Sequence, residues 1–170
     1  MNPILKPVYH WHAIYTKSRN EKKAFERLTR DGYDVYLPLI SREKQWSDRK
    51  KRVEEPLFKS YMFVRVSTKE YYEILKDPAI VRYVSFEGKA AIVPDKQIDL
   101  IRSFMGADYP LESTHELIEP GSEVRIVGGP LMGKCGEMVK FSGSHRIIVR
   151  IDIIGQSLLV NIPHFLVENK

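Results

Sequence analysis

The chain has 170 residues and carries 27 Lys and Arg against 22 Asp and Glu, a formal net charge of +5. A chain of this length forms either one large domain or two small ones, and its apolar runs are much shorter than the roughly 20 residues that a membrane-spanning helix needs. The single cysteine, Cys135, excludes an intramolecular disulfide framework and a cysteine-based zinc cluster. The N-terminus has no secretory pattern, so we expect a cytoplasmic protein with no membrane partner.

The positive charge is concentrated in the N-terminal part of the chain. Residues 1–105 carry 21 Lys and Arg against 14 acids, whereas residues 106–170 carry 6 against 8. A basic half favours encounters with polyanions such as nucleic acid, although a moderately basic surface also occurs without this role. Residues 106–119 contain four acids and no Lys or Arg, which predicts a solvated connector.

Strand and helix patterns alternate through the first 105 residues. Residues 11–16 are aromatic and bounded by polar residues, which predicts a strand, and residues 19–30 have apolar side chains at helical spacing before Gly32. The basic segment 42–52 predicts either a hairpin tip or a mobile loop. The other predicted elements are strands at 35–37, 58–66, 80–86 and 90–93, a short helix after the capping box at 67–70, and a helix at 95–105. This alternation predicts an α+β or α/β domain with helices packed on a sheet.

The last fifty residues have the pattern of a small β-barrel. Short strand candidates at 123–127, 137–141, 146–152, 157–162 and 165–167 are separated by glycine-rich turns. A barrel this small has little room for a catalytic cavity, so we expect it to act through its surface. The sequence offers no metal-ligand spacing, acid/base pair, nucleophile elbow or phosphate loop, and we therefore expect no enzyme activity, metal or cofactor.

Several motifs occur together in a characteristic order. They are Trp11-His12-Ala13-Ile14-Tyr15-Thr16-Lys17, Val35-Tyr36-Leu37-Pro38, Phe58-Lys59-Ser60-Tyr61-Met62-Phe63-Val64, Ala91-Ile92-Val93-Pro94, Gly121 through Gly136, and Ile153-Ile154-Gly155. The chain thereby resembles the NusG family of transcription elongation factors. The resemblance implies an α+β fold: an NGN domain at 8–105, an antiparallel sheet flanked by helices; a linker at 106–119; and an all-β, SH3-like KOW barrel at 120–170.

The run from Gln45 to Lys51, which leads to Glu54-Glu55-Pro56-Leu57-Phe58, is more similar to specialised, operon-targeted members of the family. The RfaH-like and UpxY-like relatives prevent early termination in long operons such as those for surface polysaccharides. The resemblance implies a monomeric antitermination factor that binds RNA polymerase and suppresses pausing. The alternative is a ribosome-associated RNA-binding KOW protein, which would not need the N-terminal domain.

The resemblance also implies an aromatic surface for the clamp helices of RNA polymerase. By motif position it comprises Tyr15, Tyr61, Phe63 and Tyr83. Strand alternation places Tyr61 and Phe63 on one face and Met62 on the other, so one set can be presented while the other is buried. The alternative is that all these aromatic residues form the core. We expect the double change Tyr61→Ala with Phe63→Ala to abolish polymerase binding without unfolding the domain.

Two basic segments are candidates for nucleic-acid binding. Specialised relatives use the region that matches the first segment to read the exposed non-template DNA strand, and we expect the second to lie near upstream DNA. The first comprises Lys17, Arg19, Asn20 and Lys23, and the second comprises Arg49, Lys50, Lys51 and Arg52. Arg and Lys bind phosphate and Asn can read a base edge, although a solvated helix face and a charged hairpin tip explain the same residues. Loss of a phosphate contact, as in Lys23→Ala, is expected to weaken binding to all sequences.

The barrel is the third candidate surface. Family members use it to recruit either a termination factor or the ribosome, through the ribosomal protein that is also called NusE. Ile154 and Phe165 are the candidate apolar contacts here, with a purely structural role as the alternative. The chain departs from the family's usual Phe-Gly-Arg at Ile154-Gly155-Gln156 and from its usual Pro-Gly at Lys59-Ser60, which leaves the choice of partner and the local turn open.

Overall fold

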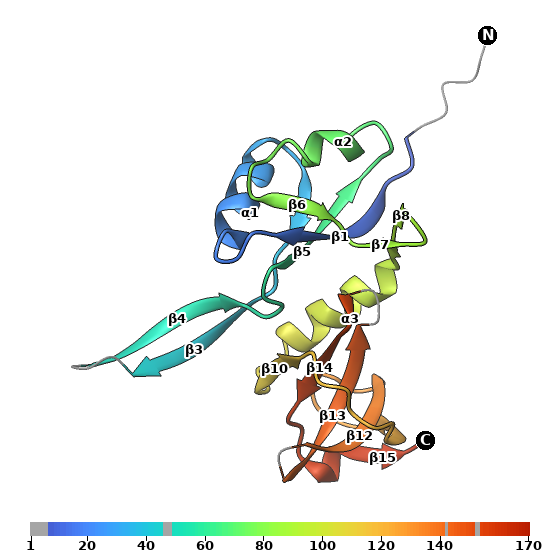
Figure 1. The fold of residues 1–170 in the computed structure, drawn as a ribbon. Coiled ribbons are helices and arrows are strands. Elements are labelled where there is room, and N and C mark those ends of the chain that lie inside the picture. Colours follow the sequence, from blue (N-terminus) through green and yellow to red (C-terminus); the bar gives the residue numbers. More distant parts are fainter. Residues whose placement is uncertain (1–6, 46–48, 142, 152–153) are drawn as a thin grey trace. The chain divides into compact units, whose positions relative to one another are not determined.

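The computed structural model describes residues 7–45, 49–141, 143–151 and 154–170 (Figure 1). The chain divides into two compact units, Met1–Ile98 and Asp99–Lys170. Every strand pair in the described residues is antiparallel, and helices are few, so the predicted α+β class is confirmed. The domain boundaries at residues 105 and 120 stay a prediction.

The first unit is built on one antiparallel sheet. Its strand order is β2–β5–β1–β6, and β9 also pairs with β1. The strands are β1 His10–Thr16, β2 Asp34–Tyr36, β5 Tyr61–Val66, β6 Ile80–Tyr83 and β9 Ile92–Val93, and the helices that follow β1 and β5 are α1 Glu21–Arg30 and α2 Tyr71–Ile74. Helix α3, Asp95–Met105, follows β9 and continues past the end of the unit at Ile98. The predicted strand at 80–86 is interrupted after Tyr83, and its end forms a small hairpin of β7 Ser85–Phe86 with β8 Lys89–Ala90.

Strand alternation directs one face of this sheet toward the helices. Ile14 on β1 and Met62 and Val64 on β5 are fully buried and belong to one core cluster with Ala24 and Leu28 of α1. In α1 these two residues lie four positions apart, on the same helical face. The opposite sheet face therefore carries the odd-numbered residues of β1 and β5, which include Tyr15 and Tyr61.

The segment between β2 and β5 forms a long hairpin. Strand β3 spans Leu39–Gln45 and strand β4 spans Lys50–Pro56, and they pair only with each other. The pair stands apart from the sheet of its unit (Figure 1). Of the two predicted alternatives, hairpin and loop, the hairpin is confirmed; Trp46, Ser47 and Asp48 of the motif that resembles the specialised relatives lie outside the described residues.

One of the two hydrogen bonds of the predicted capping box forms before α2. The Glu70 carboxylate accepts a hydrogen bond from the backbone N–H of Ser67 at 2.9 Å. The Ser67 hydroxyl donates to the same carboxylate at 2.8 Å instead of binding a backbone group of the helix. The helix that follows is short and buries only Ile74.

The turn before β5 places a serine in the left-handed region of backbone space. Ser60 has φ of 64°, a value that glycine adopts more readily than serine. Its amide donates to the buried Glu21 carboxylate at 2.8 Å, and its carbonyl accepts from the amide of Thr16 at 2.8 Å, so the turn is fixed between α1 and β1. A non-glycine residue in this region carries a steric cost of about 1 kcal/mol.

The variant Ser60→Gly is therefore expected to stabilise the first unit by up to about 0.5 kcal/mol, because relief of the steric cost exceeds the extra chain entropy of glycine. Urea unfolding followed by tryptophan fluorescence measures this change. Ser18→Gly is the control, since Ser18 has no positive φ and glycine there should destabilise. Equal destabilisation by both changes would show that the turn at Ser60 is unstrained.

The second unit is a single antiparallel sheet with the order β10–β14–β13–β12–β11–β15. Val139, Ile148 and Leu159, from three adjacent inner strands, form a buried cluster, and Ile118 packs against it. The strands are β10 Leu111–Thr114, β11 Ser122–Ile126, β12 Cys135–Phe141, β13 Ser144–Ile151, β14 Gln156–Val160 and β15 Val167–Asn169. The predicted strand at 165–167 is wrong, because His164–Leu166 form a 3₁₀ turn, η2, that leads into β15.

The predicted connector is partly a structural element. Within residues 106–119, Leu111–Thr114 form β10, which pairs with β14 over four registers. Glu112 makes an ion pair with Arg146, and the Arg150 guanidinium donates to the carbonyl of Ile118 at 3.0 Å. The expectation of a solvated connector is therefore wrong for this stretch. Its acidic composition is typical of a connector, but Leu111–Thr114 pair with the edge of β14.

Candidate functional site

An aromatic pair occupies the sheet face opposite α1. Tyr15 of β1 lies directly across from Tyr61 of β5, and their ring centroids are 5.3 Å apart in an edge-to-face arrangement. Both rings are half-buried. Arg82 of β6 is the other cross-strand neighbour of Tyr15, and its guanidinium carbon lies 5.9 Å from the centre of that ring. We call Tyr15, Tyr61 and Arg82 the tyrosine patch. The sequence analysis did not predict Arg82 as a site residue, because it lies between Val81 and Tyr83 in a strand.

Phe63 shares the face of Tyr61 but not its exposure. The alternation of Tyr61 and Phe63 against Met62 is as expected, yet Phe63 is 0% exposed. Its ring centroid lies 6.2 Å from those of both Tyr36 and Phe58. The expectation that Phe63 is presented on the surface is therefore wrong, because residues from a neighbouring strand and from the preceding loop enclose it.

Tyr83 lies on the other side of the sheet. It pairs in register with Ile14, and both side chains belong to the core cluster beneath the helices. The Tyr83 hydroxyl donates to the carbonyl of Tyr71 at 2.9 Å, the two rings stack with centroids 4.2 Å apart, and burial raises the pKa of the Tyr83 phenol. Tyr83 is a core residue, and its assignment to the same surface as Tyr15 is wrong.

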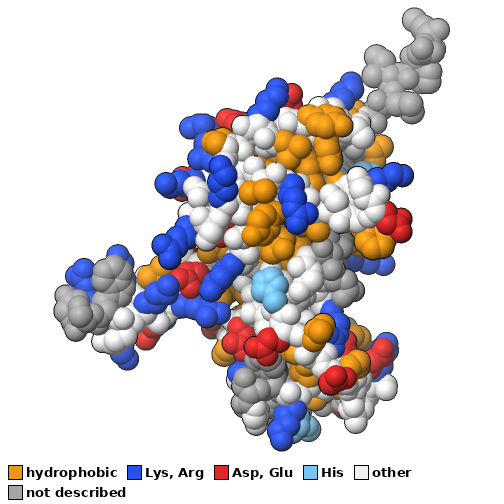
Figure 2. Space-filling model, in the orientation of Figure 1, with side chains coloured by type: hydrophobic (Ala, Val, Ile, Leu, Met, Phe, Trp, Pro, Cys, Tyr) orange, Lys and Arg blue, Asp and Glu red, His pale blue; other side chains and the backbone are white. Residues whose placement is uncertain are grey.

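The basic turn between β1 and α1 is exposed. Lys17, Arg19 and Lys23 are all exposed, and Arg19 has φ of 61°. Asn20 precedes the helix as its N-cap residue, but its side-chain amide donates to the carbonyl of Ser18 at 3.0 Å and does not cap the helix. Side chains of Lys and Arg gather on the surface over α1 and along the β3–β4 hairpin (Figure 2).

The second basic segment is divided by the hairpin. Arg49 precedes β4, and Lys50, Lys51 and Arg52 begin it, all of them exposed. Because side chains alternate along a strand, Lys51 points to the opposite face from Lys50 and Arg52. The four residues that the sequence groups together therefore do not form one surface.

The two apolar candidates of the second unit have opposite environments. Phe165 in η2 is 80% exposed, whereas Ile154 is only 5% exposed. The assignment of Ile154 as an exposed contact is therefore wrong, while Phe165 remains accessible. Met132, 70% exposed, was missed; it lies in the loop after β11, and Val127 at the start of that loop donates to the carbonyl of Leu166 at 2.9 Å.

A metal site and a membrane-spanning helix each make a specific demand on the described part of the chain. Its His, Cys, Asp and Glu side chains do not form a group of three that could hold a metal ion. Among these same residues, no helix combines the length and the apolar character that crossing a bilayer requires.

Comparison with known proteins decides the family. The family model described as transcription termination factor nusG matches residues 9–102, which include the whole sheet of the first unit. The chain belongs to the NusG family.

Relatives of known name or structure cover the NusG-family chain almost completely. The transcription termination/antitermination protein NusG of Pseudomonas aeruginosa is 27% identical over 93% of this chain and 97% of its own. The structure described as domain interaction in Thermotoga maritima NusG has a TM-score of 0.59 and 21% identity, over 95% of this chain and 97% of that one. The predicted family resemblance is confirmed, and the chain is a transcription termination/antitermination factor of this family.

Proposed function

We propose that this NusG-family factor binds RNA polymerase through the tyrosine patch and suppresses pausing and termination. The observation that carries the proposal is the pair of half-buried tyrosines on adjacent central strands, on the sheet face that α1 does not cover. Aromatic side chains lose little conformational entropy when they bind and bury a large area, which suits them to the centre of an interface. The clamp helices are the partner that the family resemblance implies.

The basic turn supports a contact with nucleic acid next to this surface. Lys17, Arg19 and Lys23 offer charge to phosphates of the non-template strand, and the strained backbone of Arg19 is typical of residues held in place for binding. Asn20 has its amide nitrogen engaged with Ser18, which leaves the side-chain oxygen to accept a hydrogen bond. Removal of Lys23 would then weaken binding to all sequences alike.

The second unit is proposed to recruit a partner through exposed apolar residues. Phe165 and Met132 supply two large apolar side chains on segments that are joined by the hydrogen bond from Val127 to Leu166. A ribosomal protein such as NusE or a termination factor is the class of partner that the resemblance implies. The function would be carried out in the cytoplasm, in specific operons such as those for surface polysaccharides.

A pull-down of the tagged protein from its native cells tests the polymerase interface. We expect the double variant Tyr15→Ala with Tyr61→Ala to recover at least tenfold less RNA polymerase than the wild type, because central aromatic contacts each contribute about 2 kcal/mol or more. Tyr72→Ala is the matched control, since Tyr72 lies on α2 and is 71% exposed.

Equal recovery of polymerase by the folded double variant would remove the tyrosine patch from the interface. Recovery of ribosomal subunits without polymerase by the wild type would favour the ribosome-associated alternative instead.

A further inference from the structure

The β3–β4 hairpin has two faces of different composition. The register pairs Arg42 with Val53 and Lys44 with Lys51, and it pairs Glu43 with Arg52 and Gln45 with Lys50. Directly paired residues point to the same side of a β-ribbon, and their neighbours along the strand point to the other. The hairpin therefore has an Arg42 face, made of Arg42, Lys44, Lys51, Val53 and Glu55, and a Glu43 face, made of Glu43, Lys50, Arg52 and Glu54.

The two faces differ in net charge. On the Glu43 face, Lys50 and Arg52 are balanced by two carboxylates, and Arg52 lies directly opposite Glu43. On the Arg42 face, the described residues supply three cations and the single carboxylate of Glu55. The positive charge of the projecting hairpin is thus gathered on one side.

Glu55, the carboxylate of the Arg42 face, is paired with a cation of the same face. Its pKa is lowered below the ordinary value by a hydrogen bond from Lys44, and by the charges of Lys44, Arg42 and Lys59. In addition, Lys44 and Lys51 are directly opposite each other. Like charges at directly opposite positions repel each other and destabilise a β-ribbon that has no bound partner. A polyanion laid on this face would reduce that repulsion.

We propose that the Arg42 face binds the sugar-phosphate backbone of duplex DNA. This proposal rests on the proposed function and assigns the contact to Arg42, Lys44 and Lys51, so that Lys51 alone of the predicted run at residues 49–52 takes part. Arg42 and Lys44 are two positions apart, so about 6.8 Å separates them along the strand, and a two-stranded ribbon fits the dimensions of the DNA major groove and its phosphate walls. The contact is independent of base sequence, because it uses charge alone.

Two charge-matched variants of the full chain test the assignment. The face variant carries Arg42→Gln, Lys44→Gln and Lys51→Gln. The control carries Lys50→Gln, Arg52→Gln and Lys69→Gln, where Lys69 is an exposed residue outside the hairpin. Each variant removes three positive charges from the formal net charge of +5, so a difference between them reports position and not total charge.

The measurement is binding to a fluorescent 25-base-pair duplex of arbitrary sequence, by anisotropy over a range of KCl concentrations. We expect the face variant to bind at least about tenfold more weakly near 0.1 M salt, with a salt slope lower by about 2 to 3, since each phosphate contact contributes about 0.9. The control should lose less than about threefold. Equal losses, no loss, or tighter binding of the wild type to phosphatidylserine vesicles than to the duplex would each overturn the proposal.

Polymerase recovery from cells separates this proposal from the proposed function. The face variant should still recover polymerase through the tyrosine patch, so weak DNA binding with normal recovery supports both conclusions. A wild type that recovers polymerase but does not bind the duplex overturns only the hairpin assignment. If circular dichroism shows that the triple change perturbs the fold, the pair Arg42→Gln with Lys51→Gln, which keeps the Lys44–Glu55 ion pair, replaces it. Lys50→Gln with Arg52→Gln is then the charge-matched control, and the expected fall in the salt slope is about 1 to 2.

Discussion

Alanine in place of Phe63 is expected to lower the free energy of unfolding of the first unit by about 3–5 kcal/mol. Phe63 is fully buried, and its ring packs against Tyr36 and Phe58, so truncation removes most of a large side chain and leaves a cavity. Urea unfolding monitored by tryptophan fluorescence measures the loss, since Trp11 is 4% exposed in the same sheet.

Tyr61→Ala is the control for this experiment. Tyr61 lies on the same strand and face but is half-buried, so its loss should cost about 1 kcal/mol. Similar costs at both positions would show that Phe63 is not the enclosed residue that the structure places there. A variant that combines Tyr61→Ala with Phe63→Ala could lose binding either because it unfolds or because it lacks the interface. For this reason the binding test replaces Tyr15 and Tyr61.

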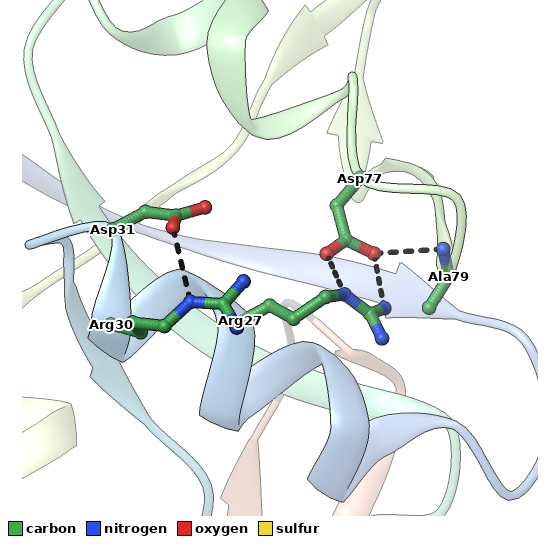
Figure 3. A network of polar contacts seen from close by, with 5 residues as sticks. All are labelled: Arg27, Arg30, Asp31, Asp77 and Ala79. Carbon is green, nitrogen blue, oxygen red and sulfur yellow. Dashed lines mark hydrogen bonds and ion pairs between the residues drawn. The ribbon is translucent and has the colours of Figure 1, made fainter.

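The second large effect is expected at the ion pair that joins α1 to the turn before β6 (Figure 3). The Nε and Nη2 atoms of Arg27 donate to the two carboxylate oxygens of Asp77 at 2.7 Å each, and the same carboxylate accepts from the amide of Ala79 at 2.8 Å. The Asp77 side chain is only 7% exposed. Arg27→Met would leave this buried carboxylate without its cation, and we expect a loss of about 2–4 kcal/mol at pH 7.

The pH dependence of this effect has a defined sign. The hydrogen bond from Arg27 is the largest cause that lowers the pKa of Asp77 below its ordinary value of 3.8, with a smaller contribution from the Ala79 amide. The stabilisation by the ion pair is therefore complete above the pKa of the unfolded state, near 4, and is lost as the pH falls through the lower pKa of the folded state. The difference between wild type and Arg27→Met should shrink between pH 5 and pH 2.

Arg30→Met on the same helix is the matched control. Arg30 approaches Asp31 at 3.7 Å, but their side chains are 74% and 54% exposed, and Figure 3 shows this pair beside the buried one. Exposed pairs contribute little, so we expect a change below about 0.5 kcal/mol at any pH. A pH-independent difference for Arg27→Met would indicate that its packing, and not the charge of Asp77, accounts for the loss.

Local patterns predicted the elements of the first unit well but not the surroundings of single residues. Alternation along β5 separated Tyr61 and Phe63 from Met62, because a strand directs side chains to alternate faces whatever lies beyond them. The burial of Phe63 depends on Tyr36 and Phe58, whose approach is a tertiary contact. The side on which Tyr83 lies follows from its register with Ile14, which spans nearly seventy residues of sequence and leaves no local signal.

The charged residues of β3, β4 and β10 hid the pattern by which a strand is predicted from a sequence. In the hairpin, the Arg42 and Glu43 faces are both polar, so the alternation of apolar and polar residues that marks a strand is absent. At Leu111–Thr114 the acidic surroundings predicted a solvated connector, but the strand forms because the edge of β14 offers it backbone partners. The family resemblance predicted the fold class. It did not predict that the basic run at residues 49–52 is divided between two faces, because this depends on the register of β3 with β4.

The edge strand β10 has a consequence for the solubility of the molecule. Strand β14, Gln-Ser-Leu-Leu-Val, is buried at every position and carries no charge that would discourage another chain from pairing with it. An uncovered edge of this kind is a template for sheet extension between molecules, the first step toward aggregation. By placing Glu112 across from Leu159, β10 both satisfies the open backbone groups of β14 and adds a charge where an intruding strand would have to lie. The acidic segment thus reduces the tendency of the folded protein to associate with itself through this sheet edge.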